Sequence, residues 1–559
     1  MIIRPFSLTQ EEKEKTVERV WERDAMLWTQ DPDAQAHVRN RLGWLDLPDR
    51  MGDHIPEISQ VAQEIKGQGF RYVVVLGMGG SSLFPLVLSE IFGAQPGYPE
   101  LKVLDSTDPV EVEKIYSLGI SNTLFIVSSK SGTTTEVKAF FNYFWHKASE
   151  EVDEPGSHFI AITDPGTPLE DLARERSFRY CFHGFPDVGG RYSAISHFGM
   201  VPAALMGLDL ELILKRAKEA MEQCRPGVPL NENPGYMLGE FLGEYSAQSR
   251  DKLSLLIDSG IYSFGLWLEQ LIAESSGKDT MGIVPIFGES TGIPGFYGGE
   301  RIFAYLRMED TPEEESLDAF VKELQEADFP LFKMTLKDRY DLFAQCFVWE
   351  FAVALACHFL GVNAFDEPDV TLAKEKTRLV LDHYRKEGKM PVNFWVDPQS
   401  QITFRPSSLL AASMKGLARA LRDMFNVLPT WGYLGFLPYL PYDPELEEVI
   451  SEMRHMVRQE RGCATVMGYG PRYLHSTGQI HKGGPLSAGF IIFTRKRDRE
   501  YPEVPEFDTS FWHIQFAQAV GDFEALNDKR KRVVHVHLPA DYLLGLRSFS
   551  KVLSRAARL

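Results

Sequence analysis

The sequence predicts an α/β protein with two doubly wound parallel-sheet domains, a helical N-terminal segment and a C-terminal α/β extension. Short runs of β-branched and aliphatic residues alternate with helical stretches, which is typical of β-α-β units around a parallel sheet. A first such series begins at Tyr72, a second near Lys252 and a third at Gly432. The length of 559 residues leaves room for several domains.

The expected domain boundaries lie where the pattern of predicted helices and strands changes. Residues 8–41 have a helical pattern, and a break with proline and glycine follows at 46–52. We therefore expect a helical segment over 1–50, a first sheet domain over 51–225, a second over 226–385, and an α/β region over 386–559 that repeats the rhythm of the second. The expected strands are 72–76, 103–104, 124–127, 159–163, 253–257, 282–287, 302–307, 432–440, 463–467 and 489–494, with a helix at 445–459.

Charge and cysteine content limit the partners and the compartment. The chain has 59 basic and 78 acidic residues, a net charge of −19, so it would repel nucleic acid and anionic membranes. Its five cysteines are widely spaced, without C-x-x-C pairs, which favours a reducing, cytoplasmic setting. The N-terminus lacks a signal-peptide pattern, and the apolar run 347–362 predicts a buried helix rather than a membrane span.

A glycine-rich turn follows the first predicted strand. From Gly77 the spacing is G-x-G-x-x-S, so Ser82 stands where a dinucleotide-binding fold has its third glycine. Two interpretations stay open at this point. The turn either approaches a bound anion, or it is a tight structural turn.

A second loop after a strand is rich in hydroxyl groups. The segment 124–136 reads LFIVSSKSGTTTE, in which serines, threonines and Lys130 precede a helix. Hydroxyl donors, one positive charge and the free N–H groups of a helix N-terminus together suit a bound phosphate. The alternative is a capping box of Thr133 and Glu136, which leaves the other hydroxyls unexplained. Because carboxyl ends of parallel strands share one sheet edge, both loops are expected to face one crevice.

A candidate general base lies in the helical segment 264–276. Its apolar stripe comprises Phe264, Trp267, Leu268, Leu271 and Ile272. Glu274 follows Trp267 by seven residues and falls on that stripe, whereas Glu269 points elsewhere. A carboxylate beside an apolar face tends toward a raised pKa, as a base near neutrality requires. The alternative is a helix-end glutamate in solvent.

The paired loops resemble those of the sugar isomerase (SIS) domain, which holds sugar phosphates. Further segments are similar to phosphoglucose isomerases, a family built from two SIS domains. They are Ala273-Glu-Ser-Ser-Gly-Lys-Asp, Gly189-Gly-Arg-Tyr-Ser, and Asn363-Ala-Phe-Asp-Glu-Pro-Asp-Val-Thr-Leu-Ala-Lys. A fourth, Leu474-His-Ser-Thr-Gly-Gln-Ile-His-Lys, resembles the family's histidine loop.

That histidine loop follows the other motifs, whereas in the common arrangement it lies between the glutamate and the lysine motifs. The order resembles the isomerase half of bacterial transaldolase–phosphoglucose isomerase fusions, although no transaldolase is apparent. The duplicated rhythm offers an explanation, with one copy supplying Glu274 and the other His475. His481 in the same loop is interpreted as structural.

The lysine segment departs from the family pattern at three positions. Glu367 replaces a glutamine, Asp369 a glycine and Thr371 a glutamate. The first change matters most, because a carboxylate cannot donate amide hydrogen bonds and repels phosphate. Phosphate contact through position 367 is therefore not expected.

The resemblance implies reversible isomerisation of glucose 6-phosphate and fructose 6-phosphate, by ring opening and proton transfer through an enediolate, without a metal or redox cofactor. It assigns the base to Glu274, ring opening to His475 assisted by Lys374, and charge stabilisation to Arg191. A structural ion pair for Arg191 and a solvated position for Lys374 are the alternatives. Gly80, Ser81, Ser129, Lys130, Ser131, Thr133 and Thr134 match positions that bind the substrate.

Two other functions and one metal pair are the alternatives to this interpretation. A sugar-phosphate-binding regulator would keep the loops without the chemistry. A nicotinamide-dependent dehydrogenase would use the Gly77 loop and Asp105, but Ser82 disfavours it. His535 and His537 share one face of a predicted strand and are interpreted as ordinary strand residues rather than metal ligands. The resemblance also implies a homodimer and leaves open which subunit supplies His475.

Overall fold

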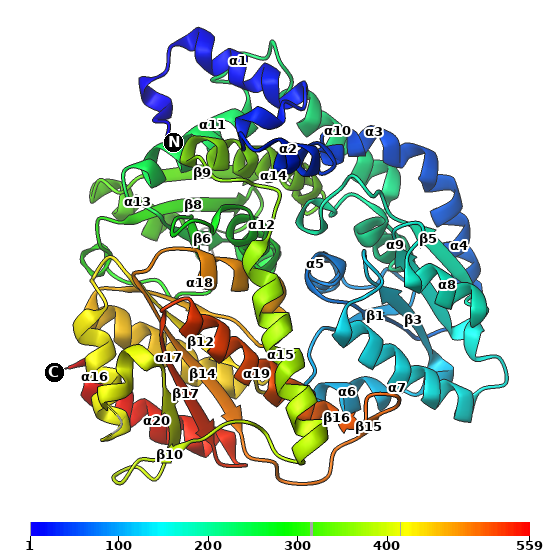
Figure 1. Cartoon of the computed structure of the whole chain (residues 1–559). Coiled ribbons are helices and arrows are strands. Elements are labelled where there is room, and N and C mark those ends of the chain that lie inside the picture. The colour runs from blue at the N-terminus through cyan, green and yellow to red at the C-terminus, as the bar shows by residue number, and fades with distance from the viewer. Residues whose placement is uncertain (1, 313–316, 414, 559) are drawn as a thin grey trace.

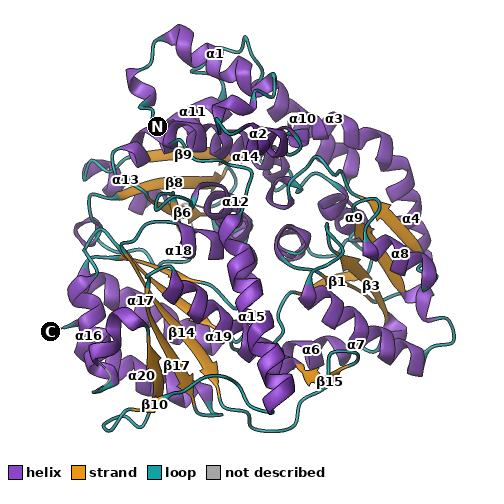
Figure 2. Cartoon of the chain, viewed as in Figure 1, coloured by secondary structure: helices purple, strands orange, loops and turns teal. Residues whose placement is uncertain are grey.

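A computed structural model of the chain describes residues 2–312, 317–413 and 415–558. Figure 1 shows three large sheets covered by helices, with the N-terminal segment on top of the second, and a small sheet of β15 (Glu503–Val504) and β16 (Thr509–Ser510). Helices and strands alternate along most of the chain (Figure 2). The predicted α/β class with parallel sheets is confirmed.

The first sheet has five parallel strands in the order β2-β1-β3-β4-β5. Val73 and Val75 of β1 belong to one core and Val74 and Leu76 to another, so helices cover both faces. The elements up to this sheet's end are α1 (Gln10–Trp21), α2 (Pro32–Arg39), α3 (Leu47–Arg50), α4 (Ile55–Gly67), β1 (Tyr72–Leu76), α5 (Leu83–Phe92), β2 (Glu100–Leu104), α6 (Pro109–Tyr116), β3 (Thr123–Ser128), α7 (Thr135–Glu151), β4 (Phe159–Thr163), α8 (Pro168–Glu175), β5 (Tyr180–His183), α9 (His197–Leu205) and α10 (Leu210–Gln223).

The second sheet is parallel and has the order β7-β6-β8-β9. Its central helix α12 carries the predicted apolar stripe, and all five stripe residues are buried. The elements are α11 (Pro234–Ala247), β6 (Lys252–Ile257), α12 (Phe264–Ser276), β7 (Val284–Ile286), β8 (Arg301–Met308), α13 (Asp318–Glu326), β9 (Leu331–Leu336), α14 (Asp341–Leu360) and α15 (Pro368–Glu387).

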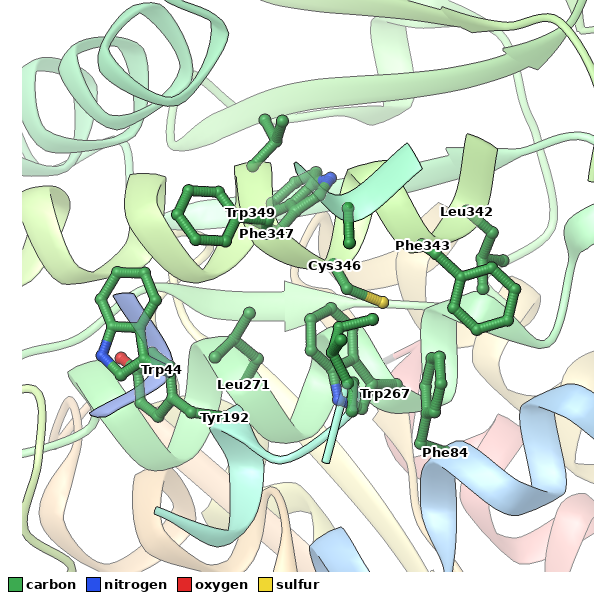
Figure 3. Packing of buried hydrophobic residues seen from close by; sticks show 14 of the residues in the cluster. Trp44, Phe84, Tyr192, Trp267, Leu271, Leu342, Phe343, Cys346, Phe347 and Trp349 are labelled. Atoms are coloured by element: carbon green, nitrogen blue, oxygen red, sulfur yellow. The ribbon is translucent and has the colours of Figure 1, made fainter. Parts of the chain in front are cut away.

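Helix α14 contains the apolar run that was predicted to be buried. It is long and apolar enough to cross a membrane, but it packs inside the protein. Figure 3 shows Phe343, Cys346 and Phe347 of α14 facing Trp267 and Leu271 of α12. This packing fixes α12, which carries the candidate base.

The third sheet has the order β10-β11-β17-β14-β12-β13, and β13, β12, β14 and β17 are parallel. Helix α15 ends two residues past the predicted boundary at 385. We propose that the other two boundaries lie before the first sheet, near residue 50, and between the first and second sheets, near residue 225. The elements are β10 (Trp395–Val396), β11 (Thr403–Pro406), α16 (Leu417–Val427), β12 (Tyr433–Pro438), α17 (Pro444–Arg461), β13 (Ala464–Met467), α18 (Gly478–Gly483), β14 (Ala488–Arg495), β15 (Glu503–Val504), β16 (Thr509–Ser510), α19 (Phe511–Asp528), β17 (Arg532–Leu538) and α20 (Tyr542–Ala557).

Candidate functional site

The glycine turn after β1 allows a close approach of two backbone segments. A Cβ atom at Gly80 would lie 2.1 Å from the carbonyl oxygen of Gly190, so only glycine fits there. Gly79 has φ +57° and lies against the backbone of His475. The Ser82 hydroxyl donates to the Gly79 carbonyl, 3.2 Å away. The turn therefore joins three segments that are far apart in the sequence.

The hydroxyl-rich loop links β3 to the N-terminus of α7. The Ser129 and Thr134 hydroxyls are 3.1 Å apart, and those of Ser131 and Thr133 are 2.9 Å apart. Lys130 Nζ lies 2.5 Å from a carboxylate oxygen of Asp164. Burial lowers the pKa of Lys130, and the Asp164 carboxylate opposes that effect. The loop thus offers hydroxyl donors and one partly neutralised cation.

Glu136 does not form the alternative capping box. Thr134 is the N-cap of α7, and its side chain makes no cap hydrogen bond. Glu136 is buried, with an oxygen 3.0 Å from His475 Nε2, and it also accepts a hydrogen bond from the Gln518 amide at 2.8 Å. Although burial favours the neutral acid, attraction to His475 lowers the pKa of Glu136. This glutamate therefore orients the imidazole.

Glu274 is buried rather than solvated, with 8% of its surface exposed. Gln270, one turn earlier on α12, donates to Glu274 Oε2 at 3.2 Å and to the His475 carbonyl at 3.0 Å. Burial raises the pKa of Glu274 to about 7, while Arg191 opposes the rise. The alternative of a helix-end glutamate in solvent is wrong, because Gln270 and Arg191 hold the carboxylate in the interior.

Arg191 connects Glu274 with the segment before α15. Its Nη1 lies 3.7 Å from Glu274 Oε2 and 3.2 Å from Glu367 Oε2, and its Nε donates to the Ser275 hydroxyl. Burial opposes the charge of Arg191, but attraction to both carboxylates outweighs it and raises its pKa above the usual value. Arg191 is therefore charged and already positioned beside the candidate base.

Glu367 and Lys374 line the same cavity as Glu274 and Arg191. Burial favours the neutral acid at Glu367, but Arg191 lowers its pKa, so the carboxylate form prevails. Its charge in turn helps to raise the pKa of Glu274. Lys374 is exposed on α15 and lines the cavity next to His475.

These residues line one cavity of about 340 Å³, between the first sheet, α12, α15 and the histidine loop. Glu274 and His475 of the same chain both face it. Of the predicted substrate-binding residues, Ser129 and Thr133 do not line it: Ser129 is buried behind Thr134, and Thr133 faces a neighbouring cavity. The predicted residues that line it are Gly80, Ser81, Lys130, Ser131, Thr134, Arg191, Glu274, Lys374 and His475.

Sequence reasoning missed Gln270 and Arg41. Gln270 could have been found, because it lies four residues before Glu274 and so on the same helix face. Arg41 follows α2 and lines the cavity from the N-terminal segment. No local pattern marks it, since only the fold brings that segment to the first sheet.

Other polar residues weighed as functional have structural partners. Asp105 is buried and accepts hydrogen bonds from Arg472 and Tyr442, so its oxygens are engaged away from the Gly77 turn. His535 and His537 both lie 2.8 Å from the Thr494 hydroxyl. Within 2–312, 317–413 and 415–558, no group of His, Cys, Asp or Glu has metal-site geometry.

Sequence profiles place part of the chain among known proteins. The family described as Phosphoglucose isomerase matches residues 28–293. The glucose-6-phosphate isomerase of Thermosynechococcus vestitus is 29% identical, with 45% of this chain and 49% of that protein aligned. That of Trichormus variabilis is 32% identical, with 38% of this chain and 41% of that protein aligned. The chain thus spans about half or less of the length of these curated relatives.

The fold has a solved counterpart. A hypothetical protein from Thermus thermophilus superposes with a TM-score of 0.56 at 25% identity, covering 66% of this chain and 95% of that one. The aligned proteins cover only part of the 559 residues, whereas the cavity uses residues from 41 to 475. The cavity is therefore formed by segments inside and outside residues 28–293, the part that matches the family.

Proposed function

Since residues 28–293 belong to the phosphoglucose isomerase family, we propose that this protein interconverts glucose 6-phosphate and fructose 6-phosphate. The observation that carries the proposal is the shared cavity, in which Glu274 and His475 face the loop of hydroxyl groups. Each step of an aldose–ketose isomerisation finds a suitable residue there.

The phosphate is proposed to bind at the second loop. Ser131 and Thr134 present hydroxyls, and the N-terminus of α7 supplies free N–H groups. Lys130 adds a cation that shares its charge with Asp164. Ser129 supports Thr134 from behind, 3.1 Å away.

Ring opening is proposed for His475. Ring opening requires a proton on the ring oxygen and removal of the proton from the anomeric hydroxyl. An imidazole can donate and accept protons near neutral pH. The Glu136 carboxylate, 3.0 Å from Nε2, fixes the ring orientation. Lys374 assists from the cavity wall.

Proton transfer is proposed for Glu274. Its carboxylate removes the proton from C2 of the aldose, giving an enediolate, and returns it to C1, while the proton of the 2-hydroxyl passes to O1. The carboxylate oxygen that the Gln270 amide binds keeps the group in place. Arg191 stabilises the developing oxyanion because its guanidinium stays charged beside Glu274.

The proposed setting follows from the same features. Five unpaired cysteines, four of them buried, support a reducing cytoplasmic compartment, where the reaction would serve glycolysis and gluconeogenesis. A homodimer is also proposed, and light scattering of the purified chain tests it. Since Glu274 and His475 of one chain line one cavity, the proposed site does not need a partner's histidine.

A coupled assay tests the function. Purified protein should convert fructose 6-phosphate to glucose 6-phosphate, and the rate should be unchanged by a chelator. Saturable binding of the sugar phosphate without turnover would contradict the proposal and indicate a regulator instead.

A further inference from the structure

A second cavity, of about 470 Å³, lies on the other side of α12 from the candidate site. Its walls come from α12, from α17 and from the loop 467–477, which contains the candidate active-site histidine. Such a volume is typical of small-molecule sites. None of the residues given a role in the isomerisation faces this cavity.

Glu269 points into this cavity without a partner. Only 7% of its surface is exposed, and it makes no hydrogen bond or ion pair within the part of the chain that the structure describes. The Glu269 oxygens open into the cavity, because they are not among the fully enclosed polar atoms that lack a partner. Keeping a carboxyl this buried without a partner still costs free energy. Burial raises the pKa of Glu269 to about 8, against the attraction of Arg454 and Arg472. A bound ligand would remove this cost.

The charges around Glu269 select the ligand. Arg472 is paired with Asp105 at 2.7 Å, and Arg454 donates to the carbonyls of Phe287, Gly288 and Thr465. Asp105 thus balances the charge of Arg472, whereas Arg454 keeps its charge and directs these three hydrogen bonds at backbone carbonyls. Three exposed carboxylates at the rim add negative charge: Glu90, Glu447 and Glu448.

Aromatic and apolar side chains complete the wall. The rings of Tyr262 and Phe287 lie 4.7 Å apart at this cavity, next to Leu266 and Met467. Aromatic faces beside a carboxylate are the usual environment for organic ammonium groups. No metal is indicated, because the described residues contain no group with metal-ligating geometry.

We propose that this second cavity binds a small organic cation, whose ammonium group pairs with Glu269 and whose apolar body lies against Tyr262 and Phe287. The site does not depend on the proposed isomerase activity. The ligand would contact Glu269, which precedes Gln270, and Ser476 and Thr477, which follow the active-site histidine. The two cavities therefore share their dividing wall.

Isothermal titration calorimetry of the full chain with 2-phenylethylammonium tests this proposal. Its neutral and anionic analogues, 2-phenylethanol and phenylacetate, are the matched ligands. We expect saturable binding of the amine at least tenfold tighter than of either analogue. Equal affinity for the alcohol, or no saturation by the amine up to about 10 mM, would overturn the proposal.

Two further measurements assign the binding to Glu269. Glu269→Gln keeps the size of the side chain and should weaken amine binding at least tenfold, whereas Glu219→Gln on the exposed face of α10 should leave it unchanged. In the unchanged protein at pH 7, amine binding should release a proton from Glu269, measured in buffers of different ionisation heat. The charged and titratable groups that line the cavity with Glu269 are Arg454, Arg472, Tyr262 and the three rim glutamates, and the two arginines act on its charge most strongly. Unaltered affinity in Glu269→Gln, or binding without proton release, would contradict the assignment.

Discussion

The four parallel strands of the third sheet have the same order as the four strands of the second sheet, but the two sheets contribute different residues to the candidate site. In both, the first strand lies between the second and the third, with the fourth beyond (β7-β6-β8-β9 and β13-β12-β14-β17). The second sheet supplies Glu274 from the helix between its first two strands. The third sheet supplies His475 from the loop after its second strand.

The loop after β7 in the second sheet corresponds in position to the loop after β13 that carries His475 in the third sheet. It contains no histidine between Phe287 and Arg301. Instead, Glu289 in this loop pairs with Arg301 at 2.9 Å and accepts hydrogen bonds from Thr465 of the third sheet. One copy of the loop therefore joins the two sheets, while the other carries the imidazole. The unusual motif order along the chain follows from this division.

The largest expected effect is on kcat, when Glu274 from the second sheet is replaced. Glu274→Gln should lower kcat by about 10²–10⁴-fold, because an amide cannot accept the C1 proton of fructose 6-phosphate, while Kd for this substrate changes little. The coupled assay and a binding titration measure both. Glu350→Gln makes the same change in the core of α14, away from the cavity, and should keep normal turnover. Comparable loss in both variants would contradict the role of Glu274.

Replacing His475, which the third sheet supplies, should lower turnover by an amount that depends on the substrate. His475→Ala should lower turnover of fructose 6-phosphate by about 10²-fold, if the imidazole opens the ring. A tetrose 4-phosphate cannot close a five- or six-membered ring, because its 4-hydroxyl carries the phosphate. Deuterium exchange at its C2 in D₂O, followed by NMR, should therefore persist in this variant. Equal losses on both substrates would remove the ring-opening role.

The attachment of the histidine loop to the third sheet should be sensitive to one buried ion pair. Lys482 Nζ lies 2.6 Å from Asp522 on α19, and both side chains are almost fully buried. Lys482→Met leaves a buried charge and should cost about 3–5 kcal/mol of stability. A clear fall in Tm is expected, whereas Lys496→Met at an exposed position should leave Tm unchanged. An unchanged Tm in Lys482→Met would mean that this pair contributes nothing net.

The smallest effect concerns the pH dependence set by Glu367. Since the pKa of Glu274 is raised to about 7 and the base acts as a carboxylate, kcat/KM should fall as pH decreases through about 7. Glu367→Gln removes a neighbouring negative charge, so this acid limb should move to lower pH. Glu387→Gln, exposed at the end of α15, is the control. A limb that stays in place in Glu367→Gln would show that the two carboxylates are not coupled.

Strands with a buried apolar run could be predicted from the sequence, β7 and β13 at sheet edges among them, and half-exposed strands without such a run could not. The strands β1 and β4 begin and end where predicted, because their aliphatic residues are buried on both faces. The strands β5 and β9 were missed because they are half exposed at sheet edges and lack a continuous apolar run.

The candidate site was predictable where chemistry follows a motif. The burial of Glu274 followed from its place on the helix stripe. The second partner of Glu136, Gln518, is separated from it by 382 residues and became visible only when α19 packed beside α7. The burial of Glu269 could not be predicted either. The helical pattern placed Glu269 away from the apolar stripe, but segments of the third sheet's domain cover that face of α12.

The most direct test of the division between the two sheets is to combine the Glu274→Gln and His475→Ala chains by coexpression and to measure fructose 6-phosphate turnover. Because one chain supplies both groups to one cavity, every site in the mixture lacks one of them, and we predict that activity stays at the level of the separate variants. If each site drew its histidine from a partner subunit, random dimers would restore about a quarter of the normal sites. Recovery to that level would contradict the account.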